Sequence, residues 1–207
     1  MTNTASTYTQ PNWDFDWFNP QPQQDSQLLE NFGFIPGLKE LLLLRQVHAL
    51  EHATVWILSE NLHNSSSESQ GDNQNLGGLS TDKGFYLYGN VQLNSLKFAV
   101  NQALNRLKAG DWHLAIHPRC GTNASVEMLL MGIFTIGNHL LFPKELISQL
   151  TGFGLATATA AYLAPDLGKS VQKYLTTSIP FNLSITEIKQ TKDSFGRKAY
   201  FVGVKWN

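Results

Sequence analysis

Apolar and polar positions form blocks along the chain, and each block predicts one element. A helix is predicted from about Asp25 to the Pro36-Gly37 pair, because Pro and Gly interrupt helices. A longer helix is predicted over about 38–61. Its middle is apolar on nearly every side, which is typical of a helix buried on most faces. Residues 63–78 are polar and aperiodic, so they predict a loop.

The remaining blocks predict β structure around one more helix. Residues 84–91 indicate a short strand region with turns, and 112–116 indicate another strand. Between them an apolar face repeats with helical spacing over 94–108, with Gly110 as the expected stop. Two alternating segments, Leu183–Thr191 and Lys198–Val204, flank a turn at 193–196 and predict a C-terminal hairpin.

Two uncharged apolar stretches, Met128–Phe142 and Leu146–Ala164, predict a helical hairpin that turns at Pro143. Their lengths approach the roughly 20 residues that cross a bilayer core. Small residues recur every fourth position in the second stretch, which lets membrane helices approach closely; they are Gly152, Ala156, Ala160 and Ala164. The alternative is a buried hairpin in a soluble core, because Thr, Ser and Gln dilute the apolar character.

The predicted fold class is therefore α+β: a helical core with a short β region, a membrane-type helical hairpin and a C-terminal β-hairpin. We expect a disordered tail over 1–28, a central domain over 29–178 that contains the apolar hairpin 126–164, and the β-hairpin over 179–207. The polar tail lacks the basic and apolar regions of a signal peptide.

Composition narrows the function classes. Only 15% of residues are charged against 42% apolar, which favours a membrane setting, either the cytoplasmic or the thylakoid membrane, with lipid as a partner. The net charge of −1 gives no basic surface for nucleic acid. The single cysteine, Cys120, excludes an internal disulfide.

Candidate chemistry lies in the long apolar helix. His48 and His52 are four residues apart, so both imidazoles share one helical face, and Glu51 lies beside them. This is the inverted zincin spacing H-x-x-E-H, in which the histidines hold zinc and the glutamate acts as general base. The alternative is a His–Glu hydrogen-bond network that locks the core, because such groups are costly to bury unpaired.

One helix supplies only two metal ligands. His117 and Cys120, in the loop from His117 to Asn123, offer the usual ligand types for zinc or another divalent transition metal, and Glu127 is a further candidate. The cations Arg45 and Arg119 are candidates for binding a substrate anion.

The segments His48–Val55, Gly84-Phe85 and His117–Asn123 together resemble a domain-of-unknown-function family common in photosynthetic bacteria. The resemblance covers about 38–165, without the tail before 30 or the β segment after 178. More loosely, the paired motifs are similar to a family of bacterial membrane proteins described as predicted metal-dependent enzymes. The resemblance implies a site made of His48, Glu51, His52, His117 and Cys120, and implies no particular reaction.

Two functions follow as hypotheses. The first is a membrane-associated metal-dependent hydrolase, with a peptidase as one form and a protein as substrate, in which Glu51 activates water. The second is a non-catalytic membrane metalloprotein that assists assembly of a membrane complex. Its site would be closed by four ligands, His48, His52, His117 and Cys120, and a closed site has no position for water.

Overall fold

The computed structural model describes residues 20–63, 76–141, 143–193 and 195–207. Most of the predicted tail 1–28 and of the predicted loop 63–78 lies outside the described residues. The elements run in chain order as α1 (Gln24–Phe32), α2 (Leu38–His63), β1 (Gly77–Thr81), β2 (Gly84–Tyr88), α3 (Leu93–Ala109), the 3₁₀ turn η2 (Trp112–Ala115), α4 (Gly121–Leu141), α5 (Leu146–Val171), the π-helical turn η3 (Gln172–Thr176), β3 (Leu183–Lys192) and β4 (Lys198–Trp206).

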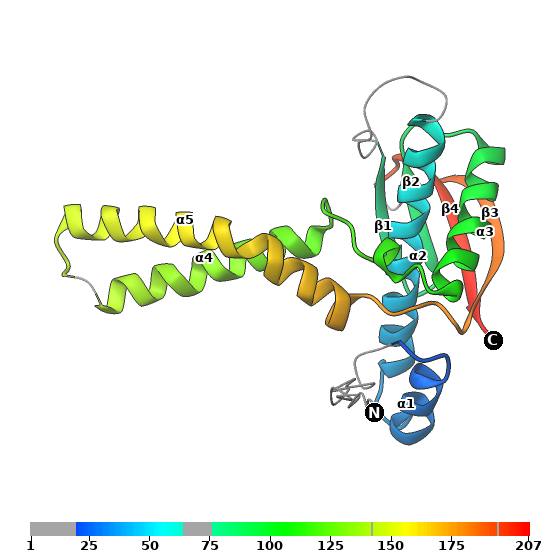
Figure 1. The fold of residues 1–207 in the computed structure, drawn as a ribbon, viewed down its shortest axis with the longest axis horizontal. Helices are drawn as coiled ribbons and strands as arrows, with labels where there is room; N and C mark the ends of the chain where they lie inside the picture. The colour runs from blue at the N-terminus through cyan, green and yellow to red at the C-terminus, as the bar shows by residue number, and fades with distance from the viewer. Residues whose placement is uncertain (1–19, 64–75, 142, 194) are drawn as a thin grey trace, which may run out of the picture.

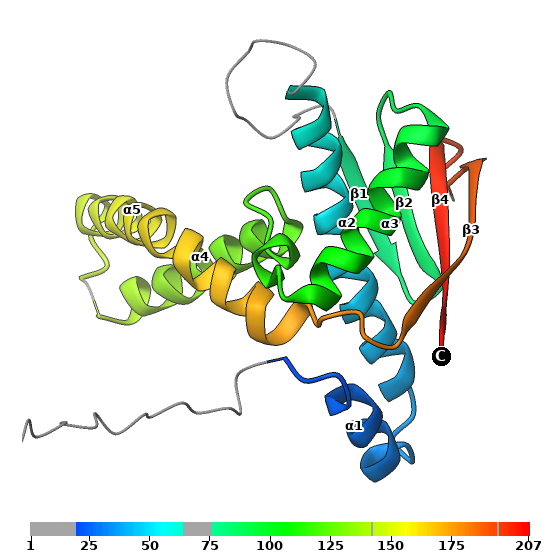
Figure 2. The ribbon, with the colours of Figure 1, turned by 45° about the vertical axis from the view of Figure 1, so that its right-hand side comes forward.

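The strands form one antiparallel sheet in the order β1-β2-β4-β3. Helices α2 and α3 lie side by side over one face of this sheet (Figures 1 and 2). Strand β4 pairs with β2 through contacts such as Phe85 with Val202, so the C-terminal hairpin is part of the same sheet as the first hairpin. The α+β class predicted from the sequence is confirmed.

The core lies between the sheet and the two helices. Side chains from α2, α3, the strands and η2 are fully or almost fully buried there; they include Val47, Leu50, Ile57, Phe85, Leu87, Leu96, Val100, Leu107, Leu114, Leu183 and Val202. Burial of this apolar area, at about 25 cal/mol per Å², is the main stabilising term of the body. It fixes α2 in the middle of the fold, with its polar side chains enclosed.

The predicted helical hairpin is present and is longer than expected. Helices α4 and α5 pack against each other and extend away from the body, which they meet only near the start of α4 and the end of α5 (Figure 1). Helix α5 passes through Pro165 and ends at Val171. At about 1.5 Å per residue, its 26 residues extend about 39 Å.

Small residues form the contact between the two hairpin helices. The buried positions of α5 are the four predicted ones and one more turn of the same ladder: Gly152, Ala156, Ala160, Ala164 and Gly168. Large apolar side chains point outward from both helices; they include Met128, Ile136, Leu140, Ile147, Leu150 and Tyr162. Among the described helices, α4 alone passes the test of length and composition for a membrane span, and only 6% of its most apolar window is buried. The hairpin is therefore not a buried core element of this chain.

Two sequence predictions were wrong in detail. Strand β1 begins at Gly77, inside the segment predicted as a loop, and pairs with β2. Glycines 77 and 78 carry no β propensity, so only the pairing reveals the strand. Residues 112–115 form a 3₁₀ turn, not a strand. The carbonyls of Ala115 and Ile116 accept hydrogen bonds from side chains of α2, so no strand ladder uses them.

The turn of the C-terminal hairpin depends on Asp193. Its Oδ1 accepts from the backbone amides of Phe195 and Arg197, and its Oδ2 accepts from Tyr88 Oη and Arg197 Nε. Burial opposes ionisation, but these donors outweigh it and lower the pKa of Asp193 to about 2. The ionised side chain thus ties the turn to strand β2.

We expect Gly152→Ala to destabilise the hairpin, because the added Cβ would collide with the buried amide of Asn138 on α4. Overpacking of this kind costs about 1–3 kcal/mol. Gly154→Ala, two residues along, is the matched control, since nothing lies within 4 Å of its Cβ position. It should be neutral or stabilising by up to about 1 kcal/mol from helix propensity. Thermal unfolding followed by circular dichroism measures both, and equal effects would contradict the packing described.

Candidate metal centre

Helix α2 brings three polar side chains to one place in the interior. The imidazoles of His48 and His52 lie one turn apart with ring centroids 4.3 Å apart. His52 is 3% exposed and Glu51 is 8% exposed, while His48 is half-buried. Groups of this kind are costly to remove from water, so each needs a partner.

Backbone carbonyls from two other segments orient the two histidines. His48 Nδ1 lies 3.0 Å from the carbonyl oxygen of Thr176 in η3, and His52 Nδ1 lies 2.7 Å from that of Ala115 in η2. A carbonyl only accepts, so each Nδ1 carries a proton, and in the neutral imidazole each Nε2 then carries the lone pair. This is the arrangement by which proteins prepare histidines for Nε2 coordination of a metal.

Cys120 completes a group of three metal-ligand types. Its Sγ lies 3.3 Å from His48 Nε2, and one ligand atom from each of His48, His52 and Cys120 lies within 4.8 Å of the other two. Tetrahedral zinc with bonds of about 2.0–2.3 Å separates its ligand atoms by roughly 3.3–3.8 Å. The distance between Cys120 and His48 lies in this range, and the 4.8 Å bound places the His52 ligand atom within about 1 Å of it. The donor types are those of a zinc ion or another borderline metal.

The thiol of Cys120 is also prepared for ionisation. Burial alone would raise its pKa, but a hydrogen bond from His52 and the charge of the imidazolium form of His52, with the backbone amide of Thr122, lower the pKa of Cys120 below the ordinary value. The Thr122 amide donates to Sγ at 3.4 Å. A thiolate is the form of cysteine that binds metals.

Glu51 lies beside the three ligand atoms without belonging to the group. Its Oε2 accepts a hydrogen bond from Ser80 of β1, and its carboxylate packs so closely over Gly78 that a Cβ there would overlap it. Burial raises the pKa of Glu51, while Ser80 and the nearby His48 lower it in part. The carboxylate lines a cavity of about 200 Å³ together with both α2 histidines and Cys120. At about 30 Å³ per molecule, this volume accommodates several waters.

His117 lines the same cavity but stands outside the group of three. It is 5% exposed, and its ring centroid lies 5.6 Å from that of His52 and 5.0 Å from that of Trp56. Its Nδ1 accepts from the backbone amide of Arg119 at 3.3 Å, and its own amide donates to Gln172. In this arrangement His117 lines the cavity and is not one of the three grouped ligands.

The other predicted site residues fall in three places. Arg119 lines the cavity and is exposed. Glu127 lies on α4 and is not in the group of ligand atoms. Arg45 lines a different cavity, where its Nη2 donates to the carbonyls of Tyr174 and Thr177.

Sequence reasoning did not identify four residues that support the site: Ser80, Gly78, Ala115 and Thr176. They contribute through their position or their backbone atoms, which no motif marks. The Gly77-Gly78 pair was the only feature of the sequence that indicated a close approach of the backbone.

A network of polar side chains connects the hairpin to this centre. Gln172 Oε1 accepts from the His117 amide, and Gln172 Nε2 donates to Asn123 Oδ1 at 2.7 Å. Asn123 occupies the space that a Cβ on Gly168 would need, and its Nδ2 donates to the Pro118 carbonyl. The network positions the cysteine-bearing loop and the end of α5 together.

The fold and this site define an α+β protein with a candidate metal centre at the foot of an apolar helical hairpin. The chain belongs to the family described as domain of unknown function DUF6391, whose model matches residues 43–188. The match continues into β3, beyond the end at 165 that the resemblance suggested. An uncharacterized protein of Picosynechococcus sp. is 48% identical over 194 residues, covering 94% of this chain and 95% of the relative. No solved structure matches.

We expect His52→Ala and Cys120→Ser each to lose bound metal, because two ligands rarely hold a divalent ion. Metal per chain is measured by atomic emission after purification and dialysis. Cobalt loading should give a thiolate charge-transfer absorption that disappears in Cys120→Ser. His139→Ala, an exposed histidine on α4, is the control and should keep the metal. Unchanged metal content in His52→Ala would rule out the centre.

Proposed function

We propose that the protein is a membrane-associated, metal-dependent hydrolase, with zinc or another divalent transition metal held by His48, His52 and Cys120. The observation that carries the proposal is the convergence of three ligand atoms beside a buried carboxylate that is not itself a ligand. Three protein ligands leave one coordination position, as in catalytic zinc sites. When bound there, zinc would supply a Lewis acid that polarises water or a substrate carbonyl.

The protein's own residues would then transfer the proton, orient the metal ligands and bind the substrate. Glu51, held in place by Ser80 and by close packing over Gly78, would take a proton from water in the cavity. Ala115 and Thr176 keep both imidazoles in the tautomer that coordinates through Nε2. The exposed Arg119 at the cavity is suited to a carboxylate or other anion of the substrate, and a peptide is one such substrate class.

The alternative of a closed site with four protein ligands is less well supported. It requires His117 to coordinate, whereas its Nδ1 accepts from the Arg119 amide and its ring lies against Trp56. Azide added to the cobalt-loaded protein distinguishes the two, since an open site binds it and its visible spectrum changes. No spectral change would favour the closed site and a role in assembly of a membrane complex.

We expect Glu51→Gln to keep the metal and to lower hydrolysis by about 10²–10⁴-fold, the usual contribution of a general base. Hydrolysis is measured on p-nitrophenyl acetate and on a fluorogenic peptide library. Gly78→Ala should act in the same direction by displacing the carboxylate, and Gly77→Ala is its matched control with open space at the Cβ position. Full activity in Glu51→Gln would contradict the assigned role.

The membrane part of the proposal is supported by the apolar outer surface of the hairpin. Ile136 and Leu150 are 64% and 62% exposed on α4 and α5. A lysine at such a position costs about 2.5–3.5 kcal/mol within a bilayer. Ile136→Lys with Leu150→Lys should therefore lower flotation with phosphatidylcholine vesicles, whereas Phe98→Lys, on the 62% exposed position of α3, should not. A wild-type protein that stays unbound would overturn membrane association.

A further inference from the structure

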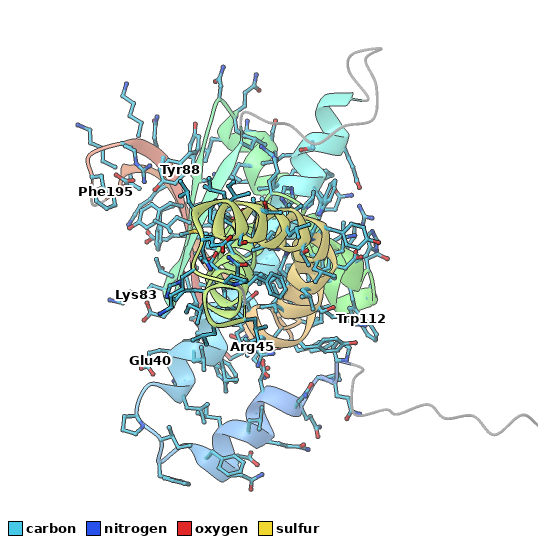
Figure 3. The ribbon with its side chains drawn as sticks, turned by 90° about the vertical axis from the view of Figure 1, so that its left-hand side faces the viewer. Glu40, Arg45, Lys83, Tyr88, Trp112 and Phe195 are labelled. Atoms are coloured by element: carbon cyan, nitrogen blue, oxygen red, sulfur yellow. The ribbon has the colours of Figure 1, made fainter. Side chains whose placement is uncertain are left out.

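A second and larger cavity lies at the foot of the hairpin. Its volume is about 520 Å³, and it is lined by Pro20 and by residues of α1, α2, η2, η3, the residue after η2 and the segment that follows η3. Figure 3, which looks along the hairpin towards the body, shows Arg45 and Trp112 between the hairpin and α1. The metal centre does not use this cavity.

The cavity carries positive and aromatic groups. Arg45, Lys173 and His113 line it, and no acidic residue does so among the described part of the chain. Two carboxylates adjoin the lining. Asp25 is 5% exposed and accepts from Gln46 and from Ser178, a residue of the cavity wall. Asp111 interacts with the charge of His113, but its Oδ2 is already paired with Arg106. The lining is thus suited to an anion rather than to a cation.

Arg45 has hydrogen-bonding capacity left over. Its Nη2 donates to two backbone carbonyls of the chain after α5, but its buried Nε has no hydrogen-bond partner among the described residues. A buried donor without a partner is unfavourable, and an anionic oxygen in the cavity would offset that cost if a small movement of the guanidinium brought Nε to it. Lys173 is exposed near the rim and adds a second cation from the end of the hairpin.

The rest of the lining suits an apolar group. Trp112, Tyr174 and Ile116 contribute rings and an aliphatic chain, and Trp112 and Tyr174 are 36% and 50% exposed. Aromatic residues that are partly exposed beside basic ones are typical of the level where lipid headgroups lie. With the hairpin in a bilayer, the cavity would be at that level, since Lys173 and Tyr174 follow α5 directly.

We propose that this cavity binds an anionic amphiphile, a phosphate or carboxylate head attached to an apolar chain. The head would lie against Arg45 and Lys173, and the chain would follow Trp112 and Tyr174 towards the outer surface of the hairpin. A bilayer lipid and a free amphiphile share this chemistry. The placement in a headgroup layer rests on the proposed membrane association, whereas the cavity and its charge do not.

The wall of this cavity also serves the metal centre. Ala115 lines the cavity, and its carbonyl orients His52; Thr176, whose carbonyl orients His48, lies between the lining residues Tyr174 and Thr177. A bound amphiphile would therefore be separated from the metal ligands His48 and His52 only by the segments that contain Ala115 and Thr176.

Trp112 provides the readout. The full chain is placed in phosphatidylcholine discs, or in buffer if the hairpin does not insert. It is titrated with octyl phosphate and, separately, with inorganic phosphate. The fluorescence of Trp112 is obtained as the difference between the wild-type protein and Trp112→Phe. We expect octyl phosphate to change this signal and to bind about five- to tenfold more weakly to Lys173→Gln, which loses one charged contact. Lys169→Gln, one turn earlier and outside the cavity lining, is the matched control and should bind normally.

Vesicles distinguish the two sources of the ligand. Brominated phosphatidylglycerol should quench Trp112 more than brominated phosphatidylcholine at the same mole fraction, and Lys173→Gln should abolish the difference. Binding of octyl phosphate without selective quenching would support the cavity with a free amphiphile as its ligand. Inorganic phosphate binding as tightly as octyl phosphate, or no effect of Lys173→Gln on either measurement, would overturn the proposal.

Arg45→Lys keeps the charge but loses Nε and the two hydrogen bonds of Nη2 to Tyr174 and Thr177. This second variant should weaken binding, and circular dichroism checks that it retains the fold. Failure of the octyl phosphate arm leaves the metal proposal and the flotation result unaffected.

Discussion

The structure depends on the need to satisfy polar side chains on a helix that lies in the middle of the fold. Helix α2 is covered by the sheet, by α3 and by the turns η2 and η3, and this cover encloses two imidazoles and a carboxylate. The solution is to bring backbone carbonyls to the histidines, from Ala115 on one side and from Thr176 on the other. The turns η2 and η3 end at Ala115 and Thr176, the two residues whose carbonyls face the histidines. The last carbonyls of a helical turn have no partner within it, so they are free to accept from a side chain.

The same constraint connects the hairpin to the site. Both hairpin ends emerge from segments that contact α2: the loop with Cys120 leads into α4, and η3 follows α5 without interruption. Gln172 and Asn123 bridge these segments below the hairpin. The segments that carry Cys120 and the Thr176 carbonyl are therefore each joined directly to one end of the hairpin.

Sequence patterns were sufficient for elements that have a strong local signal. The long apolar helix, the amphipathic α3 with its stop at Gly110 and the C-terminal hairpin were predicted near their observed bounds. The two apolar stretches around Pro143 were predicted as a helical hairpin, but α4 begins seven residues earlier and α5 ends seven residues later than predicted. Strand β1 and the turn η2 were not, because their conformations are set by partners distant in sequence. Two adjacent glycines favour a turn locally, yet Gly78 lies in a strand because it pairs with Leu87. The Glu51 carboxylate occupies the space where a side chain at position 78 would be.

For the candidate site, the sequence by itself determined the shared helical face of His48, Glu51 and His52 and the presence of one cysteine-bearing loop. A period of 3.6 residues is local geometry and needs no tertiary contact. The tertiary structure decided which residues of that loop approach the helix, bringing Cys120 to the histidines and turning His117 aside against Trp56. It also decided the tautomers, through carbonyls that no sequence pattern marks. These features depend on distances between segments more than sixty residues apart, and only packing of the complete chain fixes such distances.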